Sequence, residues 1–159
     1  MRRILVLLIA TIMLSNSMVV TAKDNDTYIK HQYQEYCKII GNKYGVCPEL
    51  LMAMIEKESS GKADAENGGC IGLMQIYEKY HKDRMERLGV KDLTNPFWNI
   101  MVGTDYLMEL AEKYEDLGFV LMKYNGDSKA NAYWETGDLS EYAASIIERS
   151  AELERIRGK

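Results

Sequence analysis

The sequence predicts an all-α domain of about six to seven helices. Apolar residues recur mainly at the three- and four-residue spacing of amphipathic helices, and the alternation typical of strands is almost absent. The chain contains only two Pro residues, Pro48 and Pro96, and both stand where helices commonly begin. Residues 23–159 are enough for one domain with a substantial core, and no repeat or low-complexity segment divides them.

Residues 1–22 have the pattern of a secretory signal. A basic start, Met1-Arg2-Arg3, precedes an apolar run of 11 residues and a cleavage-like sequence that ends at Ala22. An uncleaved membrane anchor over the apolar residues 4–20 is the alternative, although a helical span needs about 20 apolar residues. Both interpretations place the domain of residues 23–159 outside the cytoplasmic membrane, either secreted or associated with the cell envelope.

The charge balance argues against nucleic acid as a partner. The chain has 20 Lys and Arg against 24 Asp and Glu, a net charge of −4. Removal of Arg2 and Arg3 with a cleaved signal leaves 18 basic against 24 acidic residues, a charge of −6. Such a chain is poorly suited to a phosphate backbone. Recognition of an anionic polymer would have to rest on shape, stacking and hydrogen bonds.

Three cysteines remain after the signal. Export permits a disulfide, and Cys37 and Cys47 are the expected pair because they lie near the ends of two adjacent predicted helices. Cys70 is expected to be a small loop residue rather than a nucleophile, since no motif links it to His31 or His81. The cysteine spacings match no zinc-ligand pattern. We therefore expect neither a metal nor a cofactor.

Helix start and stop signals divide the first half of the domain. The expected helices cover about 27–40, 48–58, 72–77 and 78–88. Gly41 and Gly89 are the expected stops of the first and the last of these, and Pro48 opens the second in the favoured first-turn position. Several Gly and Ser residues predict a loop over 59–71, before the short third helix.

Clear caps mark the second half. The expected helices cover about 96–113, 116–124 and 141–155. Asn95 is a favourable N-cap before Pro96, Asp116 starts the next helix, and Ser140 caps the last. The polar residues 126–139 are expected to form a loop.

The second predicted helix carries an acid on its apolar face. Leu51 and Met54 belong to its buried stripe, and Glu58 follows Met54 by four residues, so its side chain projects inward. A carboxyl group that is half shielded from water keeps its proton near neutral pH and can act as a general acid. Glu56 points elsewhere and is expected to be solvated. A surface acid at a helix end is the simpler alternative for Glu58.

Several ordered motifs resemble a known family. They are Glu58-Ser59, Gly72-Leu73-Met74-Gln75-Ile76, Asn95-Pro96 with Asn99-Ile100, Gly103 and Tyr106-Leu107, Tyr124-Asn125-Gly126, and Tyr142. Over about residues 44–150 they resemble the lytic transglycosylase domain of the lysozyme superfamily, first described in soluble bacterial murein transglycosylases. They are more distantly similar to goose-type lysozymes. The fold implied is the lysozyme-like one, with helices around an active-site cleft.

The sequence departs from the family pattern near two motifs. Lys123 stands where the family usually has Ala, and Gly126 follows Asn125 one position early. Cys70 occupies a position that usually holds a small residue. These differences affect the expected shape of the cleft wall and leave the acid unchanged.

The resemblance assigns roles to particular residues. It implies that Glu58 is catalytic and that Tyr142 positions it through the phenol hydroxyl. It also implies substrate contacts, from Ser59, Met74, Gln75, Tyr124 and Asn125. Met74 is equally compatible with core packing, Tyr124 and Asn125 with a helix C-terminus, and Tyr142 with the core. Tyr133 and Trp134 are candidates for sugar stacking or for packing of their loop.

The activity implied is cleavage of peptidoglycan between N-acetylmuramic acid and N-acetylglucosamine. Most glycosidases use two carboxylates, whereas members of this family use one. Glu58 would act first as acid and then as base, and the product would carry a 1,6-anhydromuramoyl end. Lysozyme-like hydrolysis is the nearest alternative, and a non-catalytic wall-binding module is another. An envelope-spanning or secretion machine is a possible partner, together with membrane anchoring.

Overall fold

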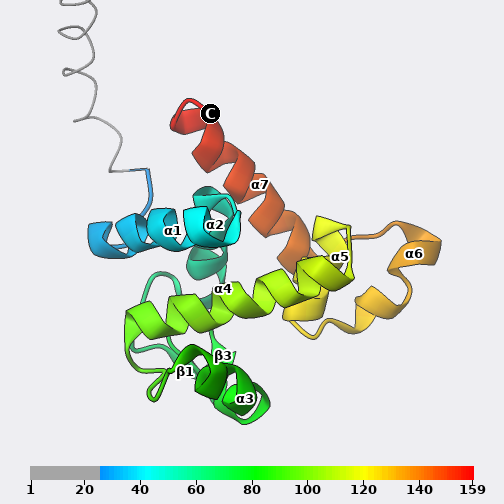
Figure 1. Cartoon of the computed structure of the whole chain (residues 1–159). Helices are drawn as coiled ribbons and strands as arrows, with labels where there is room; N and C mark the ends of the chain where they lie inside the picture. The colour runs from blue at the N-terminus through cyan, green and yellow to red at the C-terminus, as the bar shows by residue number, and fades with distance from the viewer. Residues whose placement is uncertain (1–25) are drawn as a thin grey trace, which may run out of the picture.

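The chain folds into a helical domain with one very small sheet (Figure 1). The computed structural model describes residues 26–159. Its elements are α1 (His31–Tyr44), α2 (Pro48–Ser59), β1 (Glu66–Asn67), β2 (Cys70–Ile71), β3 (Ile76–Tyr77), α3 (Glu78–Leu88), α4 (Pro96–Lys113), α5 (Leu117–Tyr124), the 3₁₀ helix η1 (Ser128–Asn131), α6 (Tyr133–Thr136) and α7 (Glu141–Ile156). The all-α prediction is therefore confirmed in outline.

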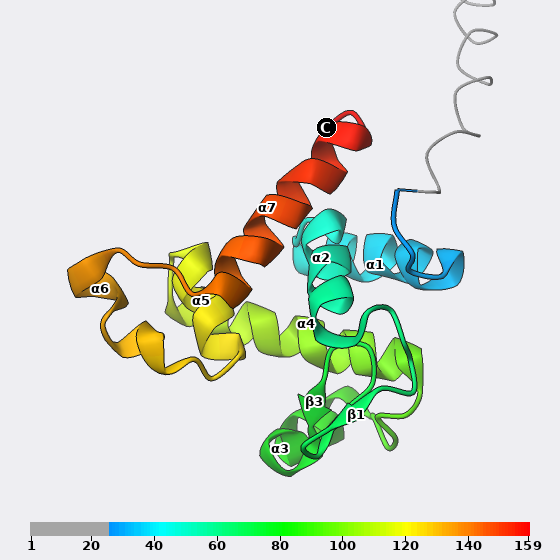
Figure 2. The same ribbon diagram turned by 180° about the vertical axis from the view of Figure 1, so that it is seen from behind.

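Helix α2 lies at the centre of the domain. It packs against α1 and α7, while α4 packs against α1 and α5 (Figures 1 and 2). The residues from Leu50 to Ile55 are all buried, so α2 has no solvated face along this stretch. A helix that is apolar on all sides belongs in the interior. The last turn of α2 extends beyond this core, so its final residues lie at the edge of the buried interior.

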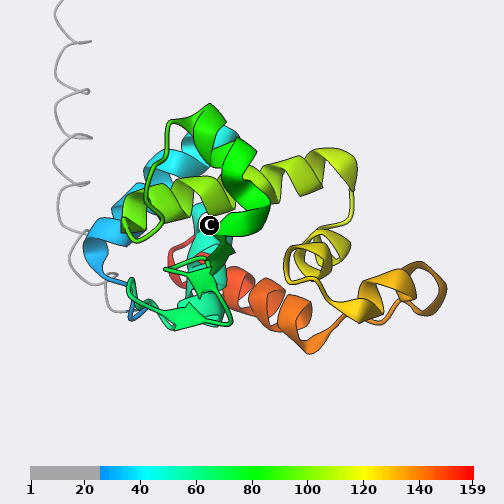
Figure 3. The ribbon, with the colours of Figure 1, turned by 90° about the horizontal axis from the view of Figure 1, so that it is seen from below.

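The remaining elements form two groups at opposite ends of the molecule. Helix α3 and the sheet lie on the same side of α4 (Figure 1), and η1 and α6 project at the opposite end (Figure 3). The sheet order is β1-β2-β3, and both pairings are antiparallel.

Most of the predicted helix boundaries are confirmed. Asn95 caps α4, because its side chain accepts hydrogen bonds from two amides of the first turn at 3.0 and 3.2 Å. Asp116 and Ser140 cap α5 and α7 in the same way. The stop at Gly89 also holds, since this residue has a left-handed φ of 70°.

The predicted end of the first helix is wrong. Helix α1 starts later and continues through Gly41 to Tyr44, and Gly45 ends it with a φ of 72°. Gly41 instead permits close packing, because a Cβ atom there would lie 2.6 Å from the carbonyl oxygen of Val46.

The short helix predicted over 72–77 is also wrong. This segment forms a turn followed by β3, which pairs with β2. Gly72 and Gln75 have left-handed φ values of 75° and 46°, and an α-helix excludes them. The loop expected over 59–71 contains β1 and β2, and the loop expected over 126–139 contains η1 and α6.

The expected disulfide is absent, because all three cysteines are free among the described residues. Cys37 is fully buried, and burial raises the pKa of its thiol to about 12. Its position was expected near a helix end, but α1 runs on to Tyr44. Cys47 donates to Glu49 Oε2 at 3.1 Å instead.

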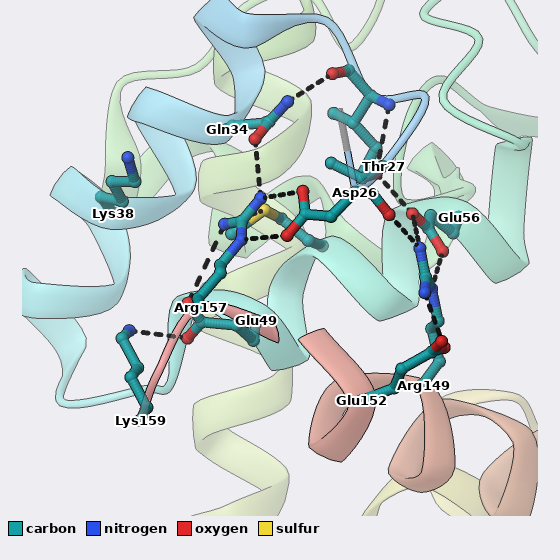
Figure 4. A network of polar contacts seen from close by, with 12 residues as sticks. Asp26, Thr27, Gln34, Lys38, Glu49, Glu56, Arg149, Glu152, Arg157 and Lys159 are labelled. Atoms are coloured by element: carbon teal, nitrogen blue, oxygen red, sulfur yellow. Dashed lines mark hydrogen bonds and ion pairs between the residues drawn. The ribbon is translucent and has the colours of Figure 1, made fainter. Parts of the chain in front are cut away.

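A polar network fastens α7 and the segment before α1 to α2 (Figure 4). Arg149 on α7 donates to Glu56 Oε2 at 2.6 Å and to the Asp26 carbonyl oxygen at 2.7 Å. Arg157 pairs with the Asp26 carboxylate at 2.7 Å. The expectation that Glu56 is solvated is therefore wrong, since it is 8% exposed and ion-paired. Helical periodicity around Glu56 could not predict this ion pair, because Arg149 is distant in sequence.

The signal or anchor predicted over residues 1–22 lies outside the described residues. Within residues 26–159, no helix combines the length and the apolar character that crossing a bilayer requires.

Candidate active site

Glu58 stands in the last turn of α2, where the helix leaves the core. The turn ends at Ser60, whose φ of 53° stops the helix. The Glu58 carboxyl is half-buried, and the Tyr142 hydroxyl donates a hydrogen bond to its Oε1. Burial raises the pKa of Glu58, while the Tyr142 hydrogen bond and the charge of Lys57 oppose part of this rise. The net effect favours a protonated carboxyl, which is what a general acid requires.

Tyr142 reaches the acid from α7. Ser140 caps this helix, and the neighbouring Ala143 is fully buried, so the first turn of α7 is fixed against the domain. Burial, and then the charge of Glu58, raise the pKa of Tyr142. The phenol therefore stays protonated and remains a hydrogen-bond donor to the carboxyl group. The predicted approach of Tyr142 to Glu58 is seen in the structure.

Asn99 holds the turn over residues 72–75 in place. This fully buried side chain accepts from the Met74 amide at 2.8 Å and donates to the Ile71 and Leu93 carbonyl oxygens at 2.7 and 3.1 Å. A Cβ atom on Gly72 would lie 2.4 Å from Asn99 Nδ2. Sequence reasoning gave Asn99 no role of its own, although it stands in the motif that follows Asn95-Pro96.

Tyr124 connects α5 to the same turn. Its hydroxyl donates to the Met74 carbonyl oxygen at 3.0 Å. Burial raises the pKa of Tyr124, and the charge of Glu58 adds to the rise, so the two groups interact electrostatically. Asn125, the next residue, is exposed at the C-terminus of α5.

A cavity of about 390 Å³ opens beside these residues. It is lined by Cys70, Gln75, Ile76, Tyr77, Tyr80, His81, Arg84, Tyr106, Glu109, Lys123, Tyr124, Asn125 and Gly126. Burial, and then the charge of Glu58, raise the pKa values of two of these lining groups, Cys70 and Tyr124. Two residues of the cavity wall thus lie near the acid, and the cavity has the size that small-molecule sites occupy, roughly 300–1,000 Å³.

The other predicted contact residues differ in their access to this cavity. Gln75 lines it, but its amide nitrogen donates to the Gly72 and Ala65 carbonyl oxygens at 2.9 and 3.1 Å. Ser59 is buried, and its hydroxyl donates to the Ile55 carbonyl oxygen at 3.0 Å. Met74 is fully buried, so its side chain belongs to the core and offers no surface to a ligand. A substrate contact by Ser59 stays a prediction.

The two aromatic residues of the projecting segment pack on α5. Tyr133 and Trp134 have ring centroids 5.9 and 5.1 Å from that of Phe119. Trp134 is nevertheless 65% exposed. The packing alternative is therefore realised for this pair, and sugar stacking by Trp134 stays a prediction. No cluster of three or more His, Cys, Asp or Glu side chains within residues 26–159 is arranged to hold a metal ion.

Comparison with known proteins identifies the family. The family described as the transglycosylase SLT domain matches residues 35–144. The chain belongs to this family. Two relatives show the same kinship: the transglycosylase of Enterobacteria phage PRD1 is 31% identical over 104 residues, and the membrane-bound lytic murein transglycosylase E of Buchnera aphidicola is 32% identical over 101 residues. The matches cover 65% and 57% of this chain but only 37% and 46% of those proteins.

A solved structure supports the SLT fold. The lytic transglycosylase Slt of Pseudomonas aeruginosa, solved as an inactive Glu→Gln mutant, superposes with a TM-score of 0.68 at 17% identity. The match covers 81% of this chain and 24% of the Pseudomonas chain. The lysozyme-like lytic transglycosylase fold expected from the sequence is thus confirmed.

Proposed function

We propose that this SLT-family chain is a peptidoglycan lytic transglycosylase with Glu58 as its single acid and base. The observation that carries the proposal is the environment of Glu58. A half-buried carboxyl with a raised pKa accepts a hydrogen bond from Tyr142 and adjoins a cavity of suitable size. Members of the family that the motifs resemble use one such carboxyl group, in place of the paired carboxylates of most glycosidases.

The reaction begins with protonation of the bond between N-acetylmuramic acid and N-acetylglucosamine. Glu58 gives its proton to the bridging oxygen as the bond from that oxygen to the muramoyl C1 breaks. The acetamido group of the same sugar stabilises the positive charge that develops at C1. The Tyr142 hydroxyl then stabilises the carboxylate that Glu58 has become.

The second step closes the sugar on itself. The Glu58 carboxylate removes the proton of the muramoyl 6-hydroxyl as its oxygen forms a bond to C1. The product is a 1,6-anhydromuramoyl end, and Glu58 regains its proton without consuming water. Gln75, Tyr124 and Asn125 on the cavity wall are the proposed substrate contacts, with Ser59 and Met74 shaping the wall behind them.

Product analysis tests the chemistry. Digestion of purified peptidoglycan by the full chain should release muropeptides with anhydro ends, which mass spectrometry separates by the mass of one water from reducing ends. Reducing ends alone would assign the chain to lysozyme-like hydrolysis. A zymogram without any clearing would favour the wall-binding module instead.

Location and partners follow from the proposed substrate. Peptidoglycan lies outside the cytoplasmic membrane, which agrees with a signal or anchor in residues 1–22. We propose an envelope-associated enzyme that opens the wall locally, with an envelope-spanning machine as a candidate partner. Fractionation of cells that produce the full chain tests the location.

A further inference from the structure

The side chain of Asn99, on α4, bonds to three separate parts of the chain. Its Oδ1 accepts from the Met74 amide at 2.8 Å, and its Nδ2 donates to the carbonyl oxygens of Ile71 and Leu93 at 2.7 and 3.1 Å. Both N–H bonds and the oxygen of this fully buried amide therefore have partners. Such a group fixes its neighbours closely, because any displacement leaves a buried polar atom unpaired.

Helix α4 also leaves no space between itself and the turn over residues 72–75. A Cβ atom on Gly72 would lie 2.4 Å from Asn99 Nδ2. One helical turn after Asn99, a Cβ atom on Gly103 would lie 2.6 Å from the sulfur of Met74. The turn is therefore in direct contact with α4 at two successive positions of that helix, and it can move only away from it.

The turn has hydrogen bonds of its own, which set its shape rather than its position. The amide and the side-chain nitrogen of Gln75 donate to the Gly72 carbonyl oxygen at 3.2 and 2.9 Å. Gln75 has a left-handed φ of 46°, and such a conformation persists where the surrounding structure holds it. Gln75 Nε2 also bonds to the Ala65 carbonyl oxygen at 3.1 Å, which joins the turn to the loop before β1. Asn99 joins the turn to the helical core.

The same turn carries part of the cavity wall. Gln75 and Tyr124 both line the cavity, and the Tyr124 hydroxyl donates to the Met74 carbonyl oxygen at 3.0 Å. Met74 is thus bonded to Asn99 through its amide and to Tyr124 through its carbonyl oxygen. Asn99 itself is fully buried, so its influence on the cavity passes through the two peptide groups of Met74.

We propose that Asn99 is a positioning residue that sets the affinity for substrate, by holding Gln75 and Tyr124 in place without touching the substrate itself. This inference rests on the proposed function, in which Gln75 and Tyr124 contact the peptidoglycan strand. The proton transfers of Glu58 have a separate support, since its partner Tyr142 belongs to α7. Loss of the Asn99 bonds should therefore weaken substrate binding and leave the chemical step nearly unchanged.

The first test removes the Asn99 bonds with Asn99→Leu, which keeps a side chain of similar size. The matched control is Thr104→Val, because Thr104 is also fully buried on α4 but donates within the helix, to the Ile100 carbonyl oxygen at 2.8 Å. With the full chain and soluble peptidoglycan fragments, Asn99→Leu should raise KM about tenfold, the effect of one lost hydrogen bond. Its kcat should change less than about twofold, and Thr104→Val should leave KM unchanged. Partial unfolding would instead lower the apparent kcat at an unchanged KM.

A second pair of variants disturbs the same contact from the side of the turn. Gly72→Ala places a methyl group against Asn99 at a φ of 75°, whereas Gly45→Ala places one in open space after α1 at a φ of 72°. Both changes impose similar backbone strain, so the pair differs in the contact with Asn99. We expect Gly72→Ala to raise KM by a factor similar to that of Asn99→Leu, and Gly45→Ala to leave KM unchanged. This pair decides the question where Asn99→Leu fails to fold.

An unchanged KM in both Asn99→Leu and Gly72→Ala overturns the proposal. Rapid hydrogen exchange of the Met74 amide in the unmodified chain also overturns it, because a lasting bond to Asn99 protects that hydrogen. The dissociation constant for the same fragments, measured in the Glu58→Gln background, follows binding without any cleavage. Weaker binding by Asn99→Leu, in a chain that never cleaves peptidoglycan, would refute the proposed function alone. Cleavage to anhydro ends with an unchanged KM in both variants would refute the positioning role alone.

Discussion

Two glutamates of α2 stand two residues apart and have opposite surroundings. Glu56 faces the polar network of Figure 4, where Arg149 neutralises its charge and Thr27 donates a further hydrogen bond. Glu58 faces the cavity side, where its bonded partner is the neutral phenol of Tyr142. One carboxyl group is thus paired with a cation, while the other has a neutral hydrogen-bond donor as its partner.

This difference separates structural from catalytic use of the same residue type. An ion pair holds a carboxylate ionised, which suits the attachment of α7 to α2 but would remove the proton that general acid catalysis needs. Burial favours the protonated form of a carboxyl group, and a phenol partner still stabilises the carboxylate after the proton has left. The side chain that pairs with each carboxyl group, rather than the position of the glutamate on α2, therefore decides its role. The following predictions change one side of this comparison at a time.

The largest effect is expected for Glu58→Gln. This change removes both proton transfers while preserving shape, so turnover of peptidoglycan should fall by at least about 10³-fold. Glu56→Gln should keep its turnover at 25 °C, because Glu56 faces away from the cavity. Release of soluble muropeptides measures both. Comparable losses in the two variants would show that the glutamates do not divide their roles as the structure indicates.

Glu56→Gln should instead lower stability. Loss of its charge leaves the partly buried Arg149 with Glu152 as its carboxylate partner and with the Asp26 carbonyl oxygen, and breaking a fully buried pair costs roughly 3–5 kcal/mol. Arg149 is 25% exposed, so we expect about 2 kcal/mol in the free energy of unfolding. Urea denaturation measures it. Glu35→Gln breaks an exposed pair with Lys38 and should cost less than about 0.5 kcal/mol; equal losses would contradict the burial argument.

Tyr142→Phe should reduce turnover about tenfold, which is the value of one hydrogen bond to a charged group. The pH dependence should change as well, because the pKa of Glu58 rises further without this donor. The matched control is Tyr28→Phe, whose hydroxyl lies 3.4 Å from the carbonyl oxygen of Glu56. It should leave turnover unchanged. An unaltered pH profile in Tyr142→Phe would argue against a positioning role.

The smallest expected effect is a pH-dependent change in the free energy of unfolding. The pKa of Glu58 in the folded state is raised above its ordinary value of 4.5. Above pH 4.5 the folded chain therefore keeps a proton that the unfolded chain has lost, and the contribution of Glu58 to stability falls as pH rises. Since Gln cannot ionise, Glu58→Gln should gain stability over the wild type from about pH 4.5 upward.

Urea denaturation between pH 4 and pH 8 tests this sign. Glu35 gives the opposite case, because Lys38 lowers the pKa of its carboxyl. Glu35→Gln should therefore lose stability relative to the wild type as pH rises. A pH-independent difference for Glu58→Gln would mean that burial does not perturb its carboxyl.

The sequence was informative where local chemistry sets the structure. Asn95, Asp116 and Ser140 were recognised as caps because a cap requires a short polar side chain just before a helix. The inward phase of Glu58 followed from its spacing to Met54. The turn over 72–75 was missed, because the left-handed conformation of Gln75 depends on contacts with Asn99 and Ala65 that are distant in sequence.

By itself the sequence determined the helical class, the main helix boundaries and the position of the acid on a buried face, since these depend on periodicity and on neighbours within a few residues. Only the tertiary structure decided which groups meet that acid and its neighbours. It paired Glu56 with Arg149, brought Tyr142 to Glu58, and connected Tyr124 to the turn at Met74. Those outcomes depend on how α7, α3 and α4 pack, and packing is a property of the whole core.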